Sequence, residues 1–249
     1  MRVSIITAVL NGADSIGRTL ESVAQQDYPD IEHVIADGNS QDATLEIVRR
    51  NRSGRIRIVS GPDSGVYSAF NKGLRAATGD VIAYLNSGDC YEHPGAVSRM
   101  LLALRTADAE AAFSDVLIVD PRRQSRIVRR YSSKKFRPSA MAYGFMPAHP
   151  TLFLRRTVYE QVGEYDPQFR IAGDFEFCLR AFIRRRTSYQ YVPEPLVRMP
   201  SGGVSNRGWR SKMAITAEML RACKMNGVRT NWVKLSLRFP VKMAELVYQ

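Results

Sequence analysis

The chain of 249 residues lacks the features that mark several large classes of protein. No window approaches the roughly 20 apolar residues of a membrane-spanning helix, and Met1–Thr7 resembles a short strand rather than an apolar signal segment. The sequence has only three cysteines, none in CxxC spacing, so neither a metal knuckle nor a disulfide framework is predicted. The odd count fits a reducing compartment. We therefore expect a cytoplasmic protein, or one that sits peripherally on the cytosolic face of the inner membrane.

Acidic residues are scarce relative to basic ones. The chain has 36 Lys and Arg against 24 Asp and Glu, which gives a formal net charge of +12. Such a balance favours a phosphorylated substrate, an anionic membrane or a nucleic acid as partner. The hydrophobic share of 45% and the charged share of 24% are ordinary for a folded domain and exclude a disordered or fibrous chain.

The first half of the sequence alternates apolar runs with helical patterns. This alternation predicts an α/β fold with a mostly parallel sheet flanked by helices. Strands are expected at Val3–Ala8, Glu32–Ala36, Arg55–Ser60, Val81–Leu85 and Ala111–Val119, and helices at Ser15–Gln25, Ala43–Arg50, Val66–Ala76 and Pro94–Arg105.

The composition and the hydrophobic pattern of the sequence change after residue 120. Arg122–Arg137 contains eight basic residues and no acidic ones, which predicts a loop or an exposed edge hairpin. His149–Leu154 has the pattern of a strand, and a helix is expected from Gly173 through Arg184. We therefore divide the chain into three segments, 1–120, 121–206 and 207–249, and expect basic amphipathic helices in the last of them.

Polar side chains follow the expected strands at the points where they end. Asn11, Asp37, Asp63 and Asp89 come after the first four strands in turn. The carboxyl ends of parallel strands form the edge at which α/β sheets bind ligands. The sequence has neither GxGxxG after its first strand nor GxxxxGK[ST], so a nucleotide would be bound without these phosphate loops. Any one of the four side chains alone is also typical of a turn or helix cap.

An ordered set of segments resembles the family 2 glycosyltransferases of the GT-A fold, of the bacterial type that assembles colanic acid and exopolysaccharides. The matching segments are SIITAVLNGADSI, ADGNSQDAT, DSGVYSAFNKGL, GDVIAYLNSGD, HPTLFLRR, IAGDFEFCLR and GGVSN. The resemblance implies transfer of a sugar from a nucleotide diphosphate donor, with a divalent metal, Mn²⁺ or Mg²⁺. It also implies a site in which the donor is bound by Thr7, Val9, Asn11, Asp37, Asp63, Asn71, Lys72, Asn86 and Ser87.

The same resemblance implies a nucleotide-sugar-binding half at 1–120 and a segment for the acceptor and the catalytic base at 121–206. It also implies which residues bind the metal and which one is the base. Asp89 corresponds to the metal-binding carboxylate of the Asp-x-Asp region, but Asn86 and Gly88 stand where many relatives have carboxylates. His149 would lie near the metal and the diphosphate, although a His before Pro is also common as a structural residue. Asp174 would be the catalytic base for a single inverting displacement, because an acceptor hydroxyl needs a base within hydrogen-bond range. An Asp at a helix start is otherwise usually a cap.

Two further segments are candidates for contacts with substrates. Gly202–Ser205 resembles a flexible loop that closes over the donor, or a plain linker. The C-terminal stretch places Trp232, Leu235, Phe239, Met243 and Leu246 at helical spacing among basic residues, with a kink expected at Pro240. Such a helix either packs on the catalytic domain or docks on an anionic membrane.

The function predicted is therefore transfer of a sugar to a glycan or a polyprenyl-diphosphate-linked acceptor in polysaccharide biosynthesis. Two alternatives remain from the residues alone. A nucleotidyltransferase could use a similar sheet, but the glycine-rich, lysine-containing phosphate loop is missing. A nucleic-acid-binding protein would fit the charge, but no recognised nucleic-acid motif appears, so no nucleic-acid partner is expected.

Overall fold

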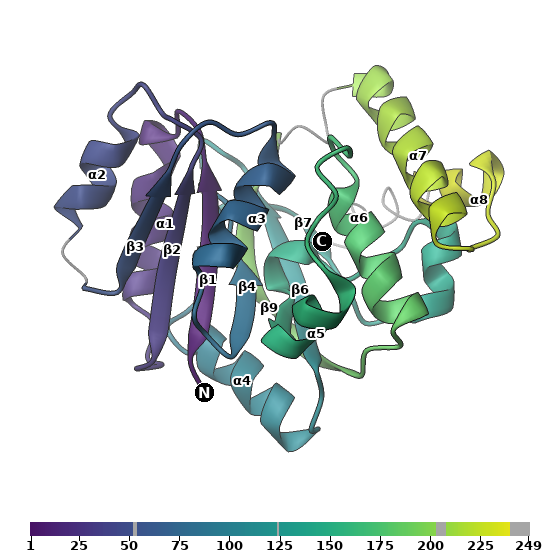
Figure 1. Ribbon diagram of the computed structural model, residues 1–249, viewed down its shortest axis with the longest axis horizontal. Helices are drawn as coiled ribbons and strands as arrows, with labels where there is room; N and C mark the ends of the chain where they lie inside the picture. The colour runs from purple at the N-terminus through teal and green to yellow at the C-terminus, as the bar shows by residue number, and fades with distance from the viewer. Residues whose placement is uncertain (52–53, 124, 203–207, 240–249) are drawn as a thin grey trace.

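The computed structural model describes residues 1–51, 54–123, 125–202 and 208–239. Its centre is one mixed sheet in the order β3-β2-β1-β4-β8-β6-β9-β5, with β7 paired to β6, and helices cover both faces (Figure 1). The strands are β1 (Val3–Val9), β2 (Ile31–Asp37), β3 (Ile56–Ser60), β4 (Val81–Tyr84), β5 (Cys90–Tyr91), β6 (Ala111–Val119), β7 (Ile127–Tyr131), β8 (Phe153–Arg155) and β9 (Tyr189–Pro200). The helices are α1 (Ala13–Ala24), α2 (Thr44–Arg50), α3 (Val66–Ala76), α4 (Ala96–Thr106), α5 (Arg156–Val162), α6 (Gly173–Cys178), α7 (Gly208–Met225) and α8 (Trp232–Ser236).

The α/β fold predicted from the alternation is confirmed. Strands β3, β2, β1 and β4 are parallel neighbours, and Val9 of β1 lies opposite Asp37, which lies opposite Ser60. Every residue of β2 and β4 is buried, as expected for strands covered by helices on both faces. The carboxyl ends of these strands therefore meet along one edge, which we call the carboxyl edge.

The second half of the sheet is mixed rather than parallel. Strand β8 is antiparallel to both β4 and β6, so β6 runs in the same direction as β4, and β9 is parallel to β6. The ends of β6 and β9 consequently reach the carboxyl edge as well. The basic tract Arg122–Arg137 contains β7, which forms an antiparallel hairpin with β6. A hairpin was one of the two structures expected for this tract, the other being a loop.

Two expectations for this half need correction. His149–Thr151 form a 3-10 turn and only Phe153–Arg155 are a strand, because Pro150 has no N–H for a ladder and the Thr151 N–H donates to the Ala148 carbonyl instead (2.9 Å). Strand β9 was not expected, since its prolines argue against a strand. Its register against β6 shifts on both sides of Asp115, which accommodates them.

The C-terminal helices belong to the main core. Met219, Ala222 and Cys223 of α7 and Leu235 of α8 are buried in the same apolar cluster as α3 and α6. No described helix has both the length and the apolar character needed to cross a bilayer. Met243 and Leu246 lie outside the described residues. Of Gly202–Ser205, only Gly202 is described. The division of the chain at residues 120 and 206 stays a prediction.

Candidate active site

The loops after β1 and β2 are tied together at the carboxyl edge. Asn11 adopts a positive φ of 49°, which Asn tolerates better than most residues. Its backbone N–H donates to Ser40 Oγ (2.8 Å), and its side-chain Oδ1 accepts from the Gln41 N–H (2.8 Å). Asn11 is exposed, so the edge presents a rigid, polar rim to solvent.

Asp37 organises the turn that follows β2. Its buried carboxylate accepts hydrogen bonds from the N–H groups of Asn39 and Ser40 and from Ser60 Oγ (2.6 Å). Burial alone would raise the pKa of Asp37, but the hydrogen bonds from Ser40, Ser60 and Asn39 outweigh it and lower the pKa. Asp37 is therefore ionised and already engaged with its own loop.

Lys72 connects the loops after β2 and β3. Its ammonium group donates to the carbonyls of Asp37 (2.8 Å) and Gly61 (2.6 Å) and lies 3.0 Å from Asp63 Oδ2. A Cβ on Gly38 would stand 3.2 Å from the same Asp63 oxygen, so Asp63 lies directly against the loop of Asp37. The structure thus brings together Asn11, Asp37, Asp63 and Lys72.

Asp89 is a buried carboxylate of the carboxyl edge with one unsatisfied oxygen. It is 4% exposed, and its Oδ2 atom is buried without any hydrogen-bond partner among the described residues. Burial raises the pKa of Asp89 to about 7, although hydrogen bonds from Asn86 oppose the shift. A buried oxygen without a partner is costly, and a cation is the partner that a carboxylate in this setting lacks. The residue present therefore fits a divalent metal.

Asn86 and Ser87 form the turn that carries Asp89. The Asp89 N–H donates to the Asn86 carbonyl (2.9 Å), and Ser87 Oγ lies 2.8 Å from Ser15 Oγ of α1. Both side chains are half-buried. Among the described residues, no group of three or more His, Cys, Asp and Glu side chains is placed to hold a metal ion.

Thr7 and Val9 lie inside the sheet rather than at its surface. Thr7 is fully buried, and its hydroxyl donates to the Leu85 carbonyl (2.7 Å). Since that uses its only proton, the contact with His33 Nε2 (2.9 Å) requires His33 to donate from a protonated Nε2. Val9 is 6% exposed and packs with α1. The structure does not bring either side chain to a ligand-accessible position.

Asp174 stands in the first turn of α6, beside α3. Its Oδ1 atom accepts from the Phe175 N–H (2.8 Å), and the Tyr67 hydroxyl lies 3.4 Å away. The same hydroxyl donates to the Ile171 carbonyl (2.6 Å). Burial and the charge of Asp174 raise the pKa of Tyr67, so Tyr67 remains a donor at neutral pH. Asp174 is only partly buried.

His149 belongs to the surroundings of Asp174. Its Nε2 atom is 2.9 Å from the Tyr165 hydroxyl, and its ring stacks on Phe70 with centroids 5.6 Å apart. Burial lowers the pKa of His149, while the nearby charge of Asp174 opposes that shift. His149 is therefore a neutral imidazole at pH 7, and no described contact joins it to Asp89.

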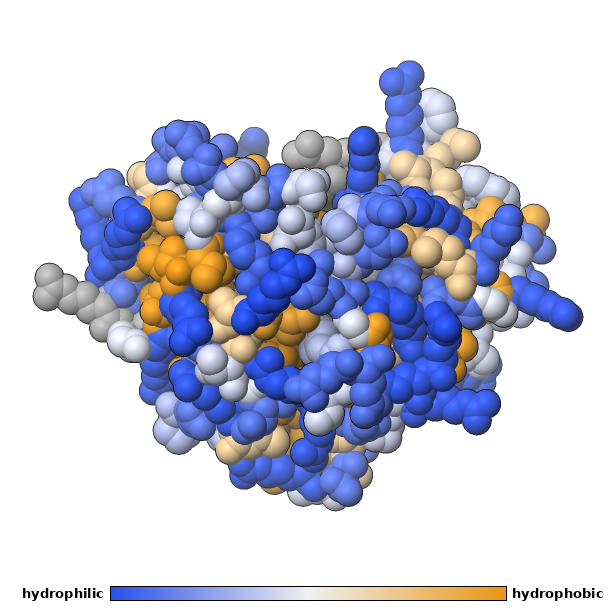
Figure 2. All heavy atoms as spheres, in the orientation of Figure 1, coloured by the Kyte–Doolittle hydropathy of each residue, from blue (hydrophilic) through white to orange (hydrophobic). Residues whose placement is uncertain are grey.

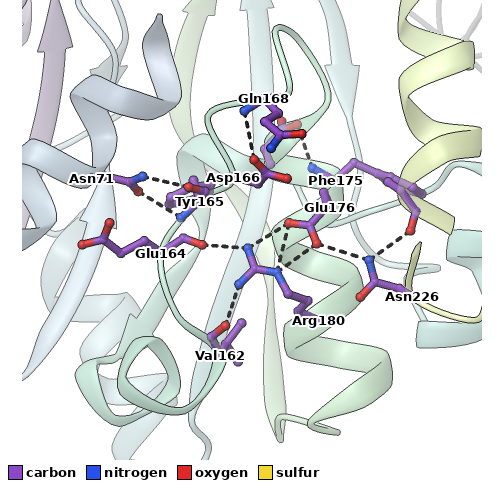
Figure 3. A network of polar contacts seen from close by, with 12 residues as sticks. Asn71, Val162, Glu164, Tyr165, Asp166, Gln168, Phe175, Glu176, Arg180 and Asn226 are labelled. Atoms are coloured by element: carbon purple, nitrogen blue, oxygen red, sulfur yellow. Dashed lines mark hydrogen bonds and ion pairs between the residues drawn. The ribbon is translucent and has the colours of Figure 1, made fainter. Parts of the chain in front are cut away.

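The polar groups of the Asn71 and Glu176 side chains are bonded to other residues of the protein. Asn71 exchanges two hydrogen bonds with the backbone of Tyr165, at 2.7 and 2.9 Å (Figure 3). Glu176 forms an ion pair with Arg180 at 2.8 Å and also accepts from Asn226 (3.2 Å). A carboxylate neutralised in this way is a poor base. The roles of all these residues in binding and catalysis stay predictions.

Sequence reasoning missed Tyr67 and Tyr165. Tyr67 stood within the matching segment DSGVYSAFNKGL, two residues after a glycine and at a helix start, which was the only available signal. Tyr165 lies between matching segments. Its contacts with Asn71 and His149 join residues far apart in the chain and leave no local pattern.

Comparison with known proteins gives the family of the chain. The family model described as "Glycosyl transferase family 2" matches residues 4–163. An uncharacterized glycosyltransferase of Mycobacterium tuberculosis is 33% identical over 186 residues, which cover 73% of this chain and 69% of that protein. A PGL/p-HBAD biosynthesis glycosyltransferase of Mycobacterium bovis is 28% identical over 208 residues, which cover 82% and 78% of the two chains.

Two solved structures illustrate the fold that this chain shares with known proteins. Residues 1–349 of Staphylococcus aureus TarS, in complex with UDP-GlcNAc, match with a TM-score of 0.71 and 17% identity over 91% of this chain and 65% of that one. The mannosyltransferase PcManGT of Pyrobaculum calidifontis, in complex with GDP-Man and Mn²⁺, matches with a TM-score of 0.64 and 20% identity over 88% and 64% of the two chains. This chain thus spans slightly less than two thirds of either structure, and the likeness shows a GT-A fold.

The buried His33 predicts a pH dependence of stability. Burial lowers the pKa of His33 from 6.5 to about 3, so as the pH falls below 6.5 the unfolded chain binds a proton that the folded chain refuses. The free energy of unfolding should then fall by up to about 1.4 kcal/mol per pH unit from this group. Urea unfolding at pH 7.5 and pH 5.0 should show a loss of about 2 kcal/mol from this source. The variant His33→Gln keeps a hydrogen-bond donor for Thr7 but does not titrate, so it should lack this part of the loss in stability. An equal loss in the variant and the wild type would contradict the prediction.

Proposed function

The chain belongs to glycosyltransferase family 2, and we propose that it moves a sugar from a nucleotide diphosphate donor to a hydroxyl of a carbohydrate or a polyprenyl-diphosphate-linked acceptor, with inversion at the anomeric carbon. The enzyme is a transferase of glycan biosynthesis, and we place it in exopolysaccharide assembly. The donor class is supported by the two structural neighbours, which were crystallised with UDP-GlcNAc and GDP-Man. The nucleotidyltransferase and nucleic-acid-binding alternatives have no comparable support.

The observation that carries the mechanism is the state of Asp174. Only its Oδ1 atom takes part in described hydrogen bonds, from Phe175 N–H and Tyr67, so Oδ2 can accept the proton of an acceptor hydroxyl. As that proton moves to Asp174, the hydroxyl oxygen bonds to the anomeric carbon and the bond from this carbon to the phosphate oxygen breaks. The nucleoside diphosphate leaves with the electron pair, and no enzyme nucleophile is needed.

Asp89 would hold the metal of the donor complex. A divalent ion supplies positive charge that stabilises the departing diphosphate, and Mn²⁺ or Mg²⁺ suits an oxygen ligand. Asp89 gives its unpartnered Oδ2 to this role. Asn11 and the loops of Asp37 and Asp63 would border the nucleotide, with Lys72 keeping those loops in place.

A lipid-linked acceptor requires contact with an anionic membrane, and two surfaces favour one. The hairpin between β6 and β7 is basic and rises from the carboxyl edge, where Val119 pairs with Ile127. At the corner formed by α7 and α8, Trp209 is 68% and Val233 72% exposed. Figure 2 shows apolar side chains at this corner among hydrophilic ones. Apolar side chains beside basic ones are suited to the interface of an anionic bilayer.

Asp174→Asn tests the base. The amide cannot accept the proton, so kcat should fall by about 10²- to 10⁴-fold, while the affinity for the nucleotide should stay within about twofold of the wild type. Asp166→Asn is a matched control on the same segment and should retain activity. Kinetics on purified enzyme, with NMR of the product linkage, measure both points. Near-normal turnover of Asp174→Asn would remove Asp174 as base, and a product with retained configuration would contradict the inverting displacement.

Asp89→Asn tests the metal. The variant keeps the size of the side chain but removes its charge, so the gain in nucleotide diphosphate affinity on adding Mn²⁺ should shrink by about tenfold or more. Asp14→Asn changes an exposed carboxylate of α1 and should leave that gain unchanged. Calorimetric titrations with UDP and GDP, with and without Mn²⁺, give the comparison. A wild-type affinity that is the same under both conditions would argue against a metal at Asp89.

The membrane contact is tested by co-sedimentation with vesicles rich in anionic lipid. A variant with Trp209→Ser and Val233→Ser should lose most of the bound fraction, and added salt should weaken binding of the wild type. Leu102→Ser is the control, because Leu102 is 61% exposed on α4, away from α7 and α8 (Figure 1). Equal sedimentation of the double variant and the wild type would reject docking at this corner.

A further inference from the structure

The segment that leads into Asp174 is held by a carboxylate of α7. Glu218 accepts hydrogen bonds from three consecutive backbone N–H groups, those of Arg170 (3.0 Å), Ile171 (2.9 Å) and Ala172 (2.8 Å). These residues immediately precede α6, which carries Asp174 in its first turn. Three charge-assisted hydrogen bonds to one side chain fix the path of this backbone more firmly than neutral ones would.

Two further contacts of α7 border the same segment. Arg221 donates to Gln168 Oε1 (2.7 Å), and its guanidinium carbon lies 4.9 Å from the centroid of the Phe169 ring. Asn226, just after α7, donates to Glu176 on α6 (Figure 3). Helix α7 and the residue Asn226 that follows it therefore contact the chain before residues 170–172, at these residues and after them.

Helix α3 holds the segment from the opposite side. The Tyr67 hydroxyl donates to the Ile171 carbonyl (2.6 Å) and lies 3.4 Å from Asp174. A Cβ at position 173 would come within 2.7 Å of the Tyr67 ring, so the glycine there permits the close approach. Ile171 thus gives its N–H to α7 and its carbonyl to α3.

We propose that Glu218 is a positioning residue that sets the place of Asp174 for proton transfer. The proposal rests on the role of Asp174 as base. Glu218 does not touch the reacting atoms, and it lies outside residues 4–163 that match the family model. Without its carboxylate, three N–H groups beside the base lose their acceptors. The backbone would then relax toward other acceptors, and a misplacement of about 1 Å near the chemistry can reduce the rate by about 10².

Glu218→Gln tests this role. An amide has one oxygen to accept hydrogen bonds, and its NH₂ group faces N–H donors, so it cannot replace the carboxylate. We expect kcat to fall by about tenfold to a hundredfold, with the nucleotide affinity and the donor KM within about twofold of the wild type. This split separates a displaced base from a general loss of structure.

Met219→Ala is the matched control. Met219 is the next residue of α7, is 5% exposed and packs into the core, so its truncation loosens the helix but keeps the carboxylate. At a comparable loss of thermal stability, Met219→Ala should retain most of its kcat. An unchanged kcat in Glu218→Gln, or an equal loss in the two variants at equal stability, would overturn the proposal.

Hydrogen exchange gives a readout that is independent of the reaction. In the wild type the amides of residues 170–172 should exchange slowly, and Glu218→Gln should accelerate them at least tenfold more than it accelerates the core strands. Equal exchange in both proteins would overturn the proposal even if the enzyme is active. Faster exchange in Glu218→Gln, together with full activity of Asp174→Asn, would refute the role of Asp174 while leaving the backbone contact established.

Discussion

The parallel pairing of β1 with β2 and β4 is the constraint on which the rest of the structure depends. Because Val9 lies opposite Asp37 and Ile6 opposite Tyr84, the loops that follow these strands leave the sheet at one level. Side chains along a strand alternate between the two faces of the sheet. The register of each pairing therefore fixes which residues face the helices and which turn carries a polar group. A shift of one residue in either pairing would separate Asp89 from the loops of Asn11 and Asp37.

Polar groups at the carboxyl edge differ in how many of their hydrogen-bonding atoms have partners within the protein. This difference distinguishes residues that hold the loops in place from residues that are free to bind a ligand. Asp37 and Lys72 each bind several partners of the protein itself. Asp89 keeps one buried oxygen without a partner, and Asp174 uses one of its two oxygens. Stability favours satisfied groups, so the unused oxygens of Asp89 and Asp174 would be available to a metal or a substrate. Asp63 Oδ2 also lacks a hydrogen bond, but it is paired with Lys72 at 3.0 Å.

The parallel half of the fold could be predicted from the sequence because each strand there is a short apolar run between helical patterns. The carboxylates at its edge followed from the same pattern, since strand ends place them. The second half was harder. Pro193 and Pro195 obscure β9, whose register against β6 shifts beside Asp115. Pro150 turns an apparent strand into a 3-10 turn. Tyr67 and Glu218 act through backbone groups 104 and 47 residues away, and such contacts leave no periodicity.

The position of Asp174 depends on the two helices that meet at its backbone. Helix α3 begins beside the loop of Asp63 and also carries Lys72, so it belongs to the half of the sheet that would bind the donor. Helix α7 carries the exposed corner that would meet an acceptor or its membrane. Since Ile171 is bonded to both helices, a shift of either one would move Asp174 relative to the other half. Under the role proposed for Asp174, the base would be placed by contacts from the donor side and the acceptor side together, which suits a reaction that requires both substrates at once.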